Sequence, residues 1–216
     1  MTTPAPIRWY FDVLSPYAWL QWPAVRRWAV SRPVEPVPVV LGALLGAAGL
    51  TGPAEHPGKR LQTYRQVWWR ARSRGQTLRF PPAHPFDPLP ALRLLTALDG
   101  HPARLEAVEA VLARCWQEGR AIDTPAALAD LALRFEIADL GAVIGDPAVK
   151  ARLRAATEDA SAAGVFGVPT VALDGALYWG EDQTGLVDAL LADPALAADP
   201  DYRALAAVPV GIERRR

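Results

Sequence analysis

Segments with the composition of β-strands occur only near the two ends of this chain, and this placement limits the folds that it can form. Residues 7–12 (IRWYFD) are aromatic and β-branched and predict a buried strand. Apolar residues with helical spacing follow over residues 17–30. Val alternates with Pro and Glu over residues 34–41, which predicts a second strand near a sheet edge. The chain therefore opens as strand, helix, strand.

The strand signals return only after Gly164. Residues 168–173 and 176–179 flank Asp174-Gly175, a pair that favours the tight turn of a β-hairpin. A last helix is expected from about Asp182 to Ala192. The end of the chain therefore reads as strand, strand, helix.

Between these ends, residues 42–165 contain helical patterns and no convincing strand. Prolines exclude a helix between residues 75 and 88, so that segment is predicted to be a loop. Residue pairs ending in proline predict the starts of three helices, at His101-Pro102, Thr124-Pro125 and Asp146-Pro147. The helices are expected over residues 59–74, 88–99, 102–118, 125–135 and 147–163.

This order of elements is that of an α/β thioredoxin-like fold with a large all-helical insertion. The thioredoxin-like domain would consist of residues 1–42 and 165–216, and the insertion of residues 43–164. No internal repeat is visible.

Composition excludes several classes of function. Hydrophobic residues make up 51% of the chain, enough for a sizeable core. Lys and Arg number 23, as do Asp and Glu, so the charge gives no reason to expect a nucleic-acid partner. No apolar stretch is long enough to cross a membrane, and no signal peptide is visible, so a cytoplasmic location is expected. A single cysteine, Cys115, suits a reducing compartment.

The first candidate site is Ser15, which follows the first predicted strand and precedes Pro16 at the start of a helix. A helix N-terminus favours a negative charge, and a thiolate there has a lowered pKa. In thioredoxin-like redox proteins the first cysteine of a C-x-x-C motif occupies this position. Here residues 15–18 are Ser, Pro, Tyr and Ala, so no dithiol forms, and the hydroxyl can instead donate to an external thiolate. The alternative is that Ser15 is an ordinary N-cap.

The second candidate site lies late in the chain. Val168-Pro169-Thr170 opens a strand, and in the thioredoxin fold the matching proline is cis and lies beside the active position. Gly180-Glu181-Asp182 then begins a helix, where backbone amides and the Asp182 carboxylate are suited to a charged ligand. The alternative is that Asp182 only caps that helix.

Taken together, these segments resemble the family of 2-hydroxychromene-2-carboxylate isomerases and kappa-class glutathione transferases, which have a DsbA-like thioredoxin fold. The family pattern F-D-x-x-S-P-Y stands here as Phe11-Asp12 with Ser15-Pro16-Tyr17. The late pattern G-V-F-G-V-P-T, followed by D-G and W-G-x-D, stands as residues 164–170, 174–175 and 179–182. Segments 41–49, 80–93 and 116–125 also look familiar, so the resemblance spans essentially the whole chain.

The resemblance implies a role for particular residues. Ser15 would activate the thiol of glutathione, and the backbone of Val168, before a cis Pro169, would pair with its cysteinyl part. Asp182 would bind the γ-glutamyl ammonium, with Glu181 contributing its amide. The resemblance also places a basic residue near the glycyl carboxylate, which is Lys59 or, with a shift of one, Arg60.

The chain departs from the family pattern at two places. Many members have Asn where Leu50 and Thr51 stand here, and many have Asn where Asp87 stands. These departures leave the substrate open.

Other reactive side chains are interpreted structurally. Cys115 lies in a predicted helix and reads as a buried small hydrophobe. His56, His84 and His101 are isolated in the sequence without metal-ligand spacing, so no metal site is expected. Trp68 and Trp69 are interpreted as core or interface, with an aromatic pocket wall as the alternative.

Three hypotheses follow for function. The first is a glutathione-dependent cis–trans isomerase of an aromatic unsaturated pyruvate. The second keeps the site but conjugates glutathione to an electrophile. The third, from a different class, is a redox-inactive thioredoxin-like module that binds peptides. The expected partners are a small aromatic substrate and, from the resemblance, a second copy of the chain in a homodimer.

Overall fold

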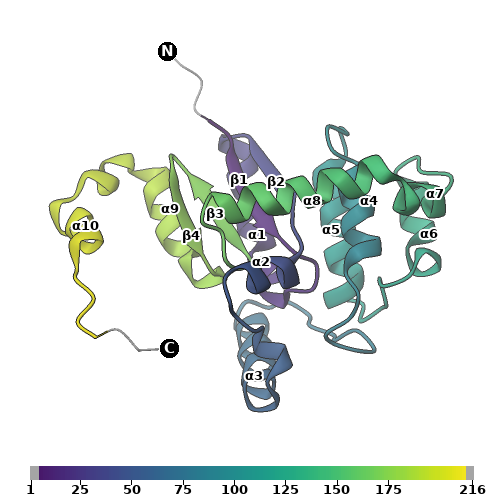
Figure 1. The fold of residues 1–216 in the computed structure, drawn as a ribbon, viewed down its shortest axis with the longest axis horizontal. Helices are drawn as coiled ribbons and strands as arrows, with labels where there is room; N and C mark the ends of the chain where they lie inside the picture. Colours follow the sequence, from purple (N-terminus) through teal and green to yellow (C-terminus); the bar gives the residue numbers. More distant parts are fainter. Residues whose placement is uncertain (1–4, 213–216) are drawn as a thin grey trace. The chain divides into compact units, whose positions relative to one another are not determined.

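The computed structural model describes residues 5–212. The chain separates into two compact units, Met1–Glu181 and Asp182–Arg216, and each is described by itself. The predicted boundaries of the helical insertion, at residues 43 and 164, are not tested by this division into compact units and stay a prediction. The first unit contains the following strands and helices (Figure 1): β1 Ile7–Phe11, α1 Pro16–Ser31, β2 Val34–Pro38, α2 Leu41–Ala47, α3 Pro57–Ser73, α4 Leu89–Ala97, α5 Arg104–Trp116, α6 Pro125–Arg134, α7 Leu140–Gly145, α8 Pro147–Ala162, β3 Thr170–Leu173 and β4 Ala176–Trp179.

The four strands form one mixed sheet in the order β2-β1-β3-β4. β1 pairs in parallel with β2 and antiparallel with β3, so Tyr10 lies opposite both Val37 and Thr170. β2 is an edge strand, as predicted. This placement suits its prolines, because proline has no N–H to donate to a second neighbouring strand. The short strands at the two ends of the chain therefore meet in the middle of one sheet.

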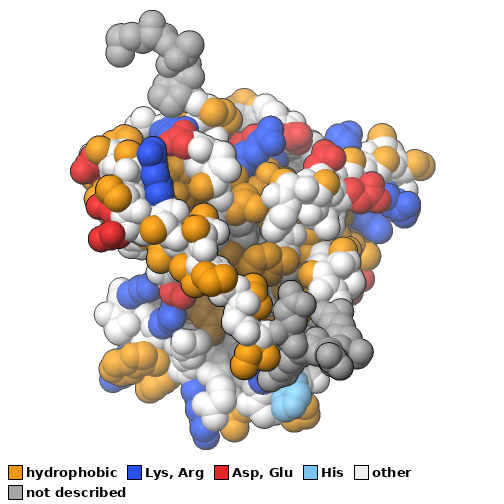
Figure 2. Space-filling model, turned by 60° about the vertical axis from the view of Figure 1, so that its left-hand side comes forward, with side chains coloured by type: hydrophobic (Ala, Val, Ile, Leu, Met, Phe, Trp, Pro, Cys, Tyr) orange, Lys and Arg blue, Asp and Glu red, His pale blue; other side chains and the backbone are white. Residues whose placement is uncertain are grey.

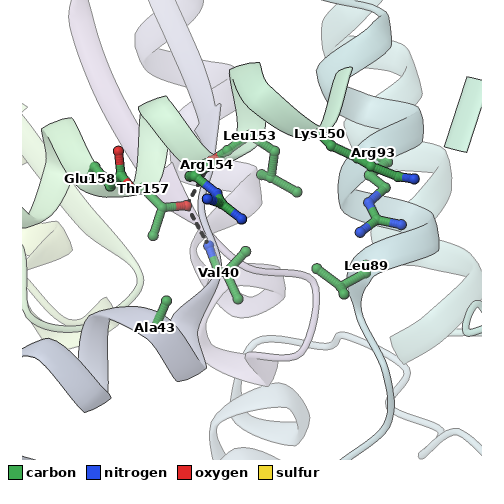
Figure 3. A pocket seen from close by; sticks show the side chains of 9 residues that line it. All are labelled: Val40, Ala43, Leu89, Arg93, Lys150, Leu153, Arg154, Thr157 and Glu158. Carbon is green, nitrogen blue, oxygen red and sulfur yellow. Dashed lines mark hydrogen bonds between the residues drawn. The ribbon is translucent and has the colours of Figure 1, made fainter. Parts of the chain in front are cut away.

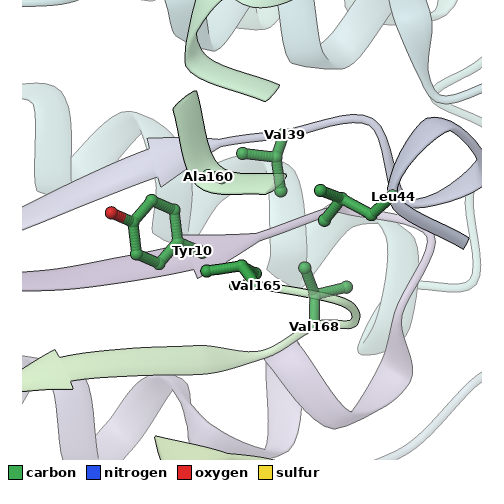
Figure 4. Close-up of a cluster of buried hydrophobic side chains, with 6 residues drawn as sticks. All are labelled: Tyr10, Val39, Leu44, Ala160, Val165 and Val168. Atoms are coloured by element: carbon green, nitrogen blue, oxygen red, sulfur yellow. The ribbon is translucent and has the colours of Figure 1, made fainter. Parts of the chain in front are cut away.

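Both faces of the sheet are covered, which explains why β1 is almost continuously apolar. On one face Trp9 stacks on Phe11, and its indole Nε1 donates to Gln21 of α1 at 2.8 Å. On the other face Tyr10 packs with Ala160 of α8 in a buried cluster (Figure 4) that also contains Val39, Leu44, Val165 and Val168. α8 crosses this face and continues to α4 and α7 (Figure 1).

The predicted hairpin is confirmed. Thr170–Leu173 pairs antiparallel with Ala176–Trp179, and both turn residues have positive φ, 50° at Asp174 and 86° at Gly175. This is the left-handed pair that the tight hairpin turn requires. Arg32, after α1, forms an ion pair with Asp174 at 2.6 Å and joins the turn to the rest of the sheet.

The helical middle of the chain is also confirmed, with differences at its ends. Thr124 and Asp146 cap α6 and α8 through their side chains, as predicted from the residue pairs. α5 begins at Arg104 and not at His101-Pro102, because residues 101–103 form a turn in which His101 Nδ1 accepts the Ala103 amide at 3.1 Å. α2 and α7 were not predicted, because each is short and contains glycines that weaken the helical pattern.

The second unit contains helices only, among its described residues. α9 spans Thr184–Ala192 and α10 spans Pro200–Ala204. Short 3₁₀ turns occupy Glu181–Gln183 at the junction, then Pro194–Ala198 and Leu205–Ala207. α9 starts two residues later than expected, because Glu181–Gln183 forms a 3₁₀ turn.

The described surface carries both signs of charge. Figure 2 shows a face on which acidic and basic side chains are interspersed with hydrophobic ones. Within residues 5–212, every helix is too short or too polar to cross a membrane. The prediction of no nucleic-acid partner and the prediction of a cytoplasmic location both stay predictions.

The hairpin turn gives a test of the fold. Replacing Gly175 with Ala places a Cβ on a left-handed backbone, which costs about 1–2 kcal/mol of unfolding free energy. Gly46 in α2 is the matched control, since a Cβ there meets open space and Ala is the better helix former. Urea unfolding should show a loss for Gly175→Ala and no loss for Gly46→Ala. Equal stability of the two variants would contradict the turn geometry.

Candidate functional site

Ser15 stands at the position where the β1 strand passes into the α1 helix. It has the extended backbone of an N-cap residue, but its hydroxyl does not cap the helix. Pro16 has no N–H, and the Ala18 amide already binds the Ser15 carbonyl at 3.1 Å. The hydroxyl instead donates to the carbonyl of Val168 over a long 3.5 Å. Ser15 is therefore the N-cap residue of α1 by its backbone, as the alternative has it, but its side chain makes no capping hydrogen bond.

The surroundings of this hydroxyl favour an anion. The first turn of α1 contains no acidic residue, and Pro16 stands at its first position. The positive end of a sixteen-residue helix is thus uncompensated beside Ser15. Ser15 keeps 6% of its surface exposed, so the hydroxyl is largely screened from water. Hydrogen bonds to an anion are stronger in such a screened position.

Val168 and Pro169 form the opposite wall of the position. The peptide bond between them is cis, as the resemblance implies. The carbonyl of Pro169 accepts the Gly180 amide at 2.8 Å, and the Thr170 hydroxyl donates to the Gly167 carbonyl at 2.7 Å. Among the described residues, the Val168 amide has no hydrogen-bond acceptor.

The side chain of Asp12 fixes the loop that precedes Ser15 through hydrogen bonds to backbone amides. Its side chain is fully buried, and its two oxygens accept the amides of Leu14 and Leu41, each at 2.9 Å. Burial raises the pKa of this carboxyl to about 6, although the two backbone hydrogen bonds oppose the rise and the nearby Asp87 adds to it. One carboxylate thus joins the end of β1, the Ser15 loop and the start of α2.

Side chains of the helical middle hold the carbonyls of the same loop. Trp116, at the end of α5, donates its Nε1 proton to the Val13 carbonyl at 3.0 Å. His84, in the loop before α4, lies with Nε2 3.0 Å from the Leu14 carbonyl. Since a carbonyl only accepts, Nε2 is the protonated nitrogen. The loop carbonyls are therefore fixed by residues about 70 and 100 positions away in the chain.

His84 has a second partner on its other nitrogen. Nδ1 lies 2.8 Å from the hydroxyl of Tyr64 in α3, which is the donor when Nε2 carries the proton. Burial lowers the pKa of His84, Arg60 lowers it further, and the bond to Leu14 opposes both. The neutral ring thus links α3 to the Ser15 loop. His84 is isolated in the sequence, and the fold brings it to partners that are 20 and 70 residues away.

Glu181 anchors α3 on another side. Its carboxylate is buried and forms ion pairs with Arg70 and with Arg74, the latter at 2.5 Å. The Arg70 guanidinium also lies over the Tyr17 ring, 5.9 Å from its centre. The side chain of Glu181 therefore holds α3 near the start of α1. The predicted role of its backbone amide stays a prediction.

The remaining predicted residues are exposed. Lys59 lies in the first turn of α3, and its amide donates to His56 Nδ1 at 3.4 Å. Arg60, the alternative, is exposed on the same turn. Asp182 is the first residue of the second unit, and the N-cap position of α9 is held by Gln183. Asp182 is therefore not the N-cap residue of α9, contrary to the alternative interpretation.

Sequence reasoning missed an aromatic pair beside Val168. Phe166 and Trp179 pack with ring centres 4.8 Å apart and remain 40% and 53% exposed. The Trp179 indole covers Gly167 so closely that a Cβ there would lie 2.6 Å from its Nε1. Trp68 and Trp69 are also more than half exposed, so they are not core residues of the chain.

Cys115 takes no part in this site. It is fully buried in α5, and burial raises the pKa of its thiol far above the usual value. A buried neutral thiol is a poor nucleophile. Among residues 5–212, no three His, Cys, Asp or Glu side chains come together as metal ligands would.

A family comparison decides the broader assignment. The model of the DSBA-like thioredoxin domain matches residues 6–192. The chain belongs to the DsbA-like thioredoxin family. This membership confirms the predicted α/β thioredoxin-like fold with a helical insertion. No curated protein matches the chain.

Solved structures share this fold at low sequence identity. The structure of 2-hydroxychromene-2-carboxylate isomerase has a TM-score of 0.79 and 21% identity, covering 91% of this chain and 98% of that one. The cytosolic disulfide reductase DsbM from Pseudomonas aeruginosa, solved with GSH, has a TM-score of 0.61 and 15% identity, covering 87% and 100%. The DsbA-like fold thus occurs in proteins described both as an isomerase and as a disulfide reductase.

Asp12 generates a pH-dependent prediction for this DsbA-like chain. Its folded-state pKa, about 6, lies above the ordinary value of 3.8, so the folded state binds the proton more tightly. The wild type should therefore lose stability as the pH rises from about 4 to about 6, by up to about 3 kcal/mol. Asp12→Asn should lack this component, although its amide leaves one backbone N–H without an acceptor. Urea unfolding across this range measures the difference, and parallel curves for the two proteins would contradict it.

Proposed function

We propose that this chain is a glutathione-dependent enzyme in which Ser15 activates the glutathione thiol for cis–trans isomerisation of an aromatic unsaturated pyruvate. The observation that carries the proposal is the uncapped hydroxyl of Ser15 at a helix N-terminus, beside the free amide of Val168. This pair offers one donor to a thiolate and one to the backbone of a small peptide. The resemblance of the sequence motifs supplies the identity of that peptide.

Dithiol chemistry has no support in this chain. Residues 15–18 contain no cysteine, and the single cysteine, Cys115, is buried. A disulfide reductase needs a thiolate that attacks and a second thiol that resolves the mixed disulfide. The catalytic sulfur must therefore come with the ligand.

When bound, glutathione supplies a thiolate that adds reversibly to a conjugated double bond, so that rotation about the resulting single bond exchanges the isomers before the thiolate leaves. The Ser15 hydroxyl holds the charged sulfur by turning away from Val168. Its present bond is long, so little is lost when it turns. The helix terminus contributes a fixed positive potential that needs no rearrangement.

Other residues serve the rest of the ligand and the substrate. Val168 and Pro169 would align the cysteinyl part, Asp182 would bind the γ-glutamyl ammonium beside the Glu181 amide, and Lys59 would face the glycyl carboxylate. Phe166 lies two residues before Val168, and the ring of Trp179, which stands opposite Thr170 in the sheet, packs against it. Such rings suit an aromatic substrate. A homodimer remains part of this proposal.

Replacing Ser15 with Ala should abolish most of the glutathione-dependent turnover. Loss of one preorganised donor to an anion costs on the order of 3 kcal/mol, or about a hundredfold in rate. Ultraviolet titration should show the pKa of bound glutathione rising toward its free value. Ser31→Ala is the matched control, since Ser31 lies at the other end of α1 and, among residues 5–212, its hydroxyl bonds only to the Trp28 carbonyl.

The same measurements separate the alternatives. A binding module would hold glutathione without lowering its pKa in the wild type. A transferase would lower the pKa but release a product with the mass of glutathione added, whereas an isomerase releases an isomer of equal mass. Unchanged turnover of the Ser15 variant at saturating glutathione would remove Ser15 from the mechanism.

Replacing Asp182 with Asn should weaken glutathione binding without slowing the saturated rate. The proposed contact is distant from the sulfur and is equally strong before and during the reaction, so it is uniform binding. A hydrogen bond between charged groups contributes roughly 1.5–3 kcal/mol, which corresponds to about tenfold or more in affinity. Calorimetry with glutathione measures this change. An unaltered affinity would exclude Asp182 from the site.

A further inference from the structure

A pocket lies between the start of α2, α4 and α8 (Figure 3). Its volume is about 390 Å³. None of its lining residues belongs to the loop of residues 12–15 or to the segment of residues 166–169. The walls are formed by Val40, Ala43, Leu89, Arg93, Lys150, Leu153, Arg154, Thr157 and Glu158.

The inner wall of this pocket is apolar. Val40, Leu89 and Leu153 contribute aliphatic side chains. The hydroxyl of Thr157 is already used, because it donates to the Leu153 carbonyl at 2.8 Å and accepts the Val40 amide at 3.1 Å. A ligand that fills this space therefore meets hydrocarbon and not free polar groups.

The opening of the pocket is cationic. Figure 3 shows Arg93 of α4 and Arg154 of α8 reaching toward the space above Val40 and Leu89. Lys150 lies one turn before Arg154 on α8. Among the described residues, none of these three cations has a carboxylate within ion-pair distance, including the neighbouring Glu158.

Arg93 is the least satisfied of the three. Its Nη1 reaches only the Ile144 carbonyl, at 3.5 Å, and its Nε is buried without a hydrogen-bond partner. A buried donor without a partner is unfavourable, and like charges that share one opening repel each other. An anion at the opening would relieve both costs. A guanidinium is well suited to a planar carboxylate, which it can bind through two parallel hydrogen bonds.

We propose that this pocket binds a small carboxylic acid anion with an apolar body, separately from the glutathione site. Arg93, Lys150 and Arg154 hold the carboxylate, and the aliphatic wall covers the body. The volume is in the range of ordinary small-molecule sites. This site goes beyond the proposed isomerase activity, because it requires neither Ser15 nor a thiol.

Calorimetry with phenylpropionate tests the proposal on the whole chain. This acid carries a carboxylate on an apolar body and has no double bond conjugated to it, so it does not react with thiols. Phenylpropionate should bind, while the uncharged phenylpropionamide and the small anion acetate should each bind at least about tenfold more weakly. Binding should weaken as salt is added, because the charges stand at an open rim. No binding, or equal binding of acid and amide, would overturn the proposal.

Variants locate the bound acid. Lys150→Gln and Arg154→Gln leave the packing of α8 intact, since both side chains are exposed, and the double variant should bind phenylpropionate about tenfold more weakly. Arg152→Gln is the matched control, because Arg152 is exposed on the same helix and does not line the pocket. Ser15→Ala and saturating glutathione should leave the affinity unchanged. An equal loss in the Arg152 variant, or a loss in the Ser15 variant, would place the acid elsewhere and overturn the proposal.

Discussion

The buried carboxylate of Asp12 is the interaction on which the architecture of the candidate site depends. It accepts one amide from the Ser15 loop and one from the start of α2, so two segments about 30 residues apart share one acceptor. Without it, both partly buried amides would lose this acceptor, and a buried donor without a partner costs roughly 1–3 kcal/mol. The raised pKa shows that the charge itself is unfavourable there. The charged form of Asp12 therefore lowers the folding stability near neutral pH, while its two hydrogen bonds fix the loop.

The helical insertion supplies the remaining hydrogen bonds that fix the loop before Ser15. Trp116 binds the Val13 carbonyl and His84 binds the Leu14 carbonyl, so every residue from Asp12 to Leu14 is held by a group outside the loop or by its own side chain. Tyr64 fixes the His84 ring in turn, and α3 carries Tyr64. A thioredoxin-like sheet alone would lack these partners. The insertion therefore positions Ser15 as well as enlarging the core.

The features that could be predicted from the sequence are those that depend on interactions between residues close together in the chain. Asp174-Gly175 marked the hairpin because its positive φ angles are an intrinsic preference, and Thr124 and Asp146 marked helix starts because their caps lie within three residues. The edge position of β2 followed from its prolines. The network around Ser15 was not predictable in this way. His84, Tyr64 and Trp116 meet the loop only through the tertiary fold, and the hydroxyl of Ser15 turns to Val168, 153 residues away.

A serine at position 15 changes the chemistry available at the start of α1, while the surrounding backbone keeps the arrangement described above. The helix terminus, the cis Val168-Pro169 peptide and the pinned loop stabilise negative charge whichever atom side chain 15 carries. A cysteine there would itself become the thiolate and exchange disulfides. A hydroxyl remains protonated at neutral pH, so it can only donate a hydrogen bond to a charge that arrives from outside. Cys115 is buried and its thiol pKa is raised, so it does not supply that charge, and under the proposed function an external thiol does.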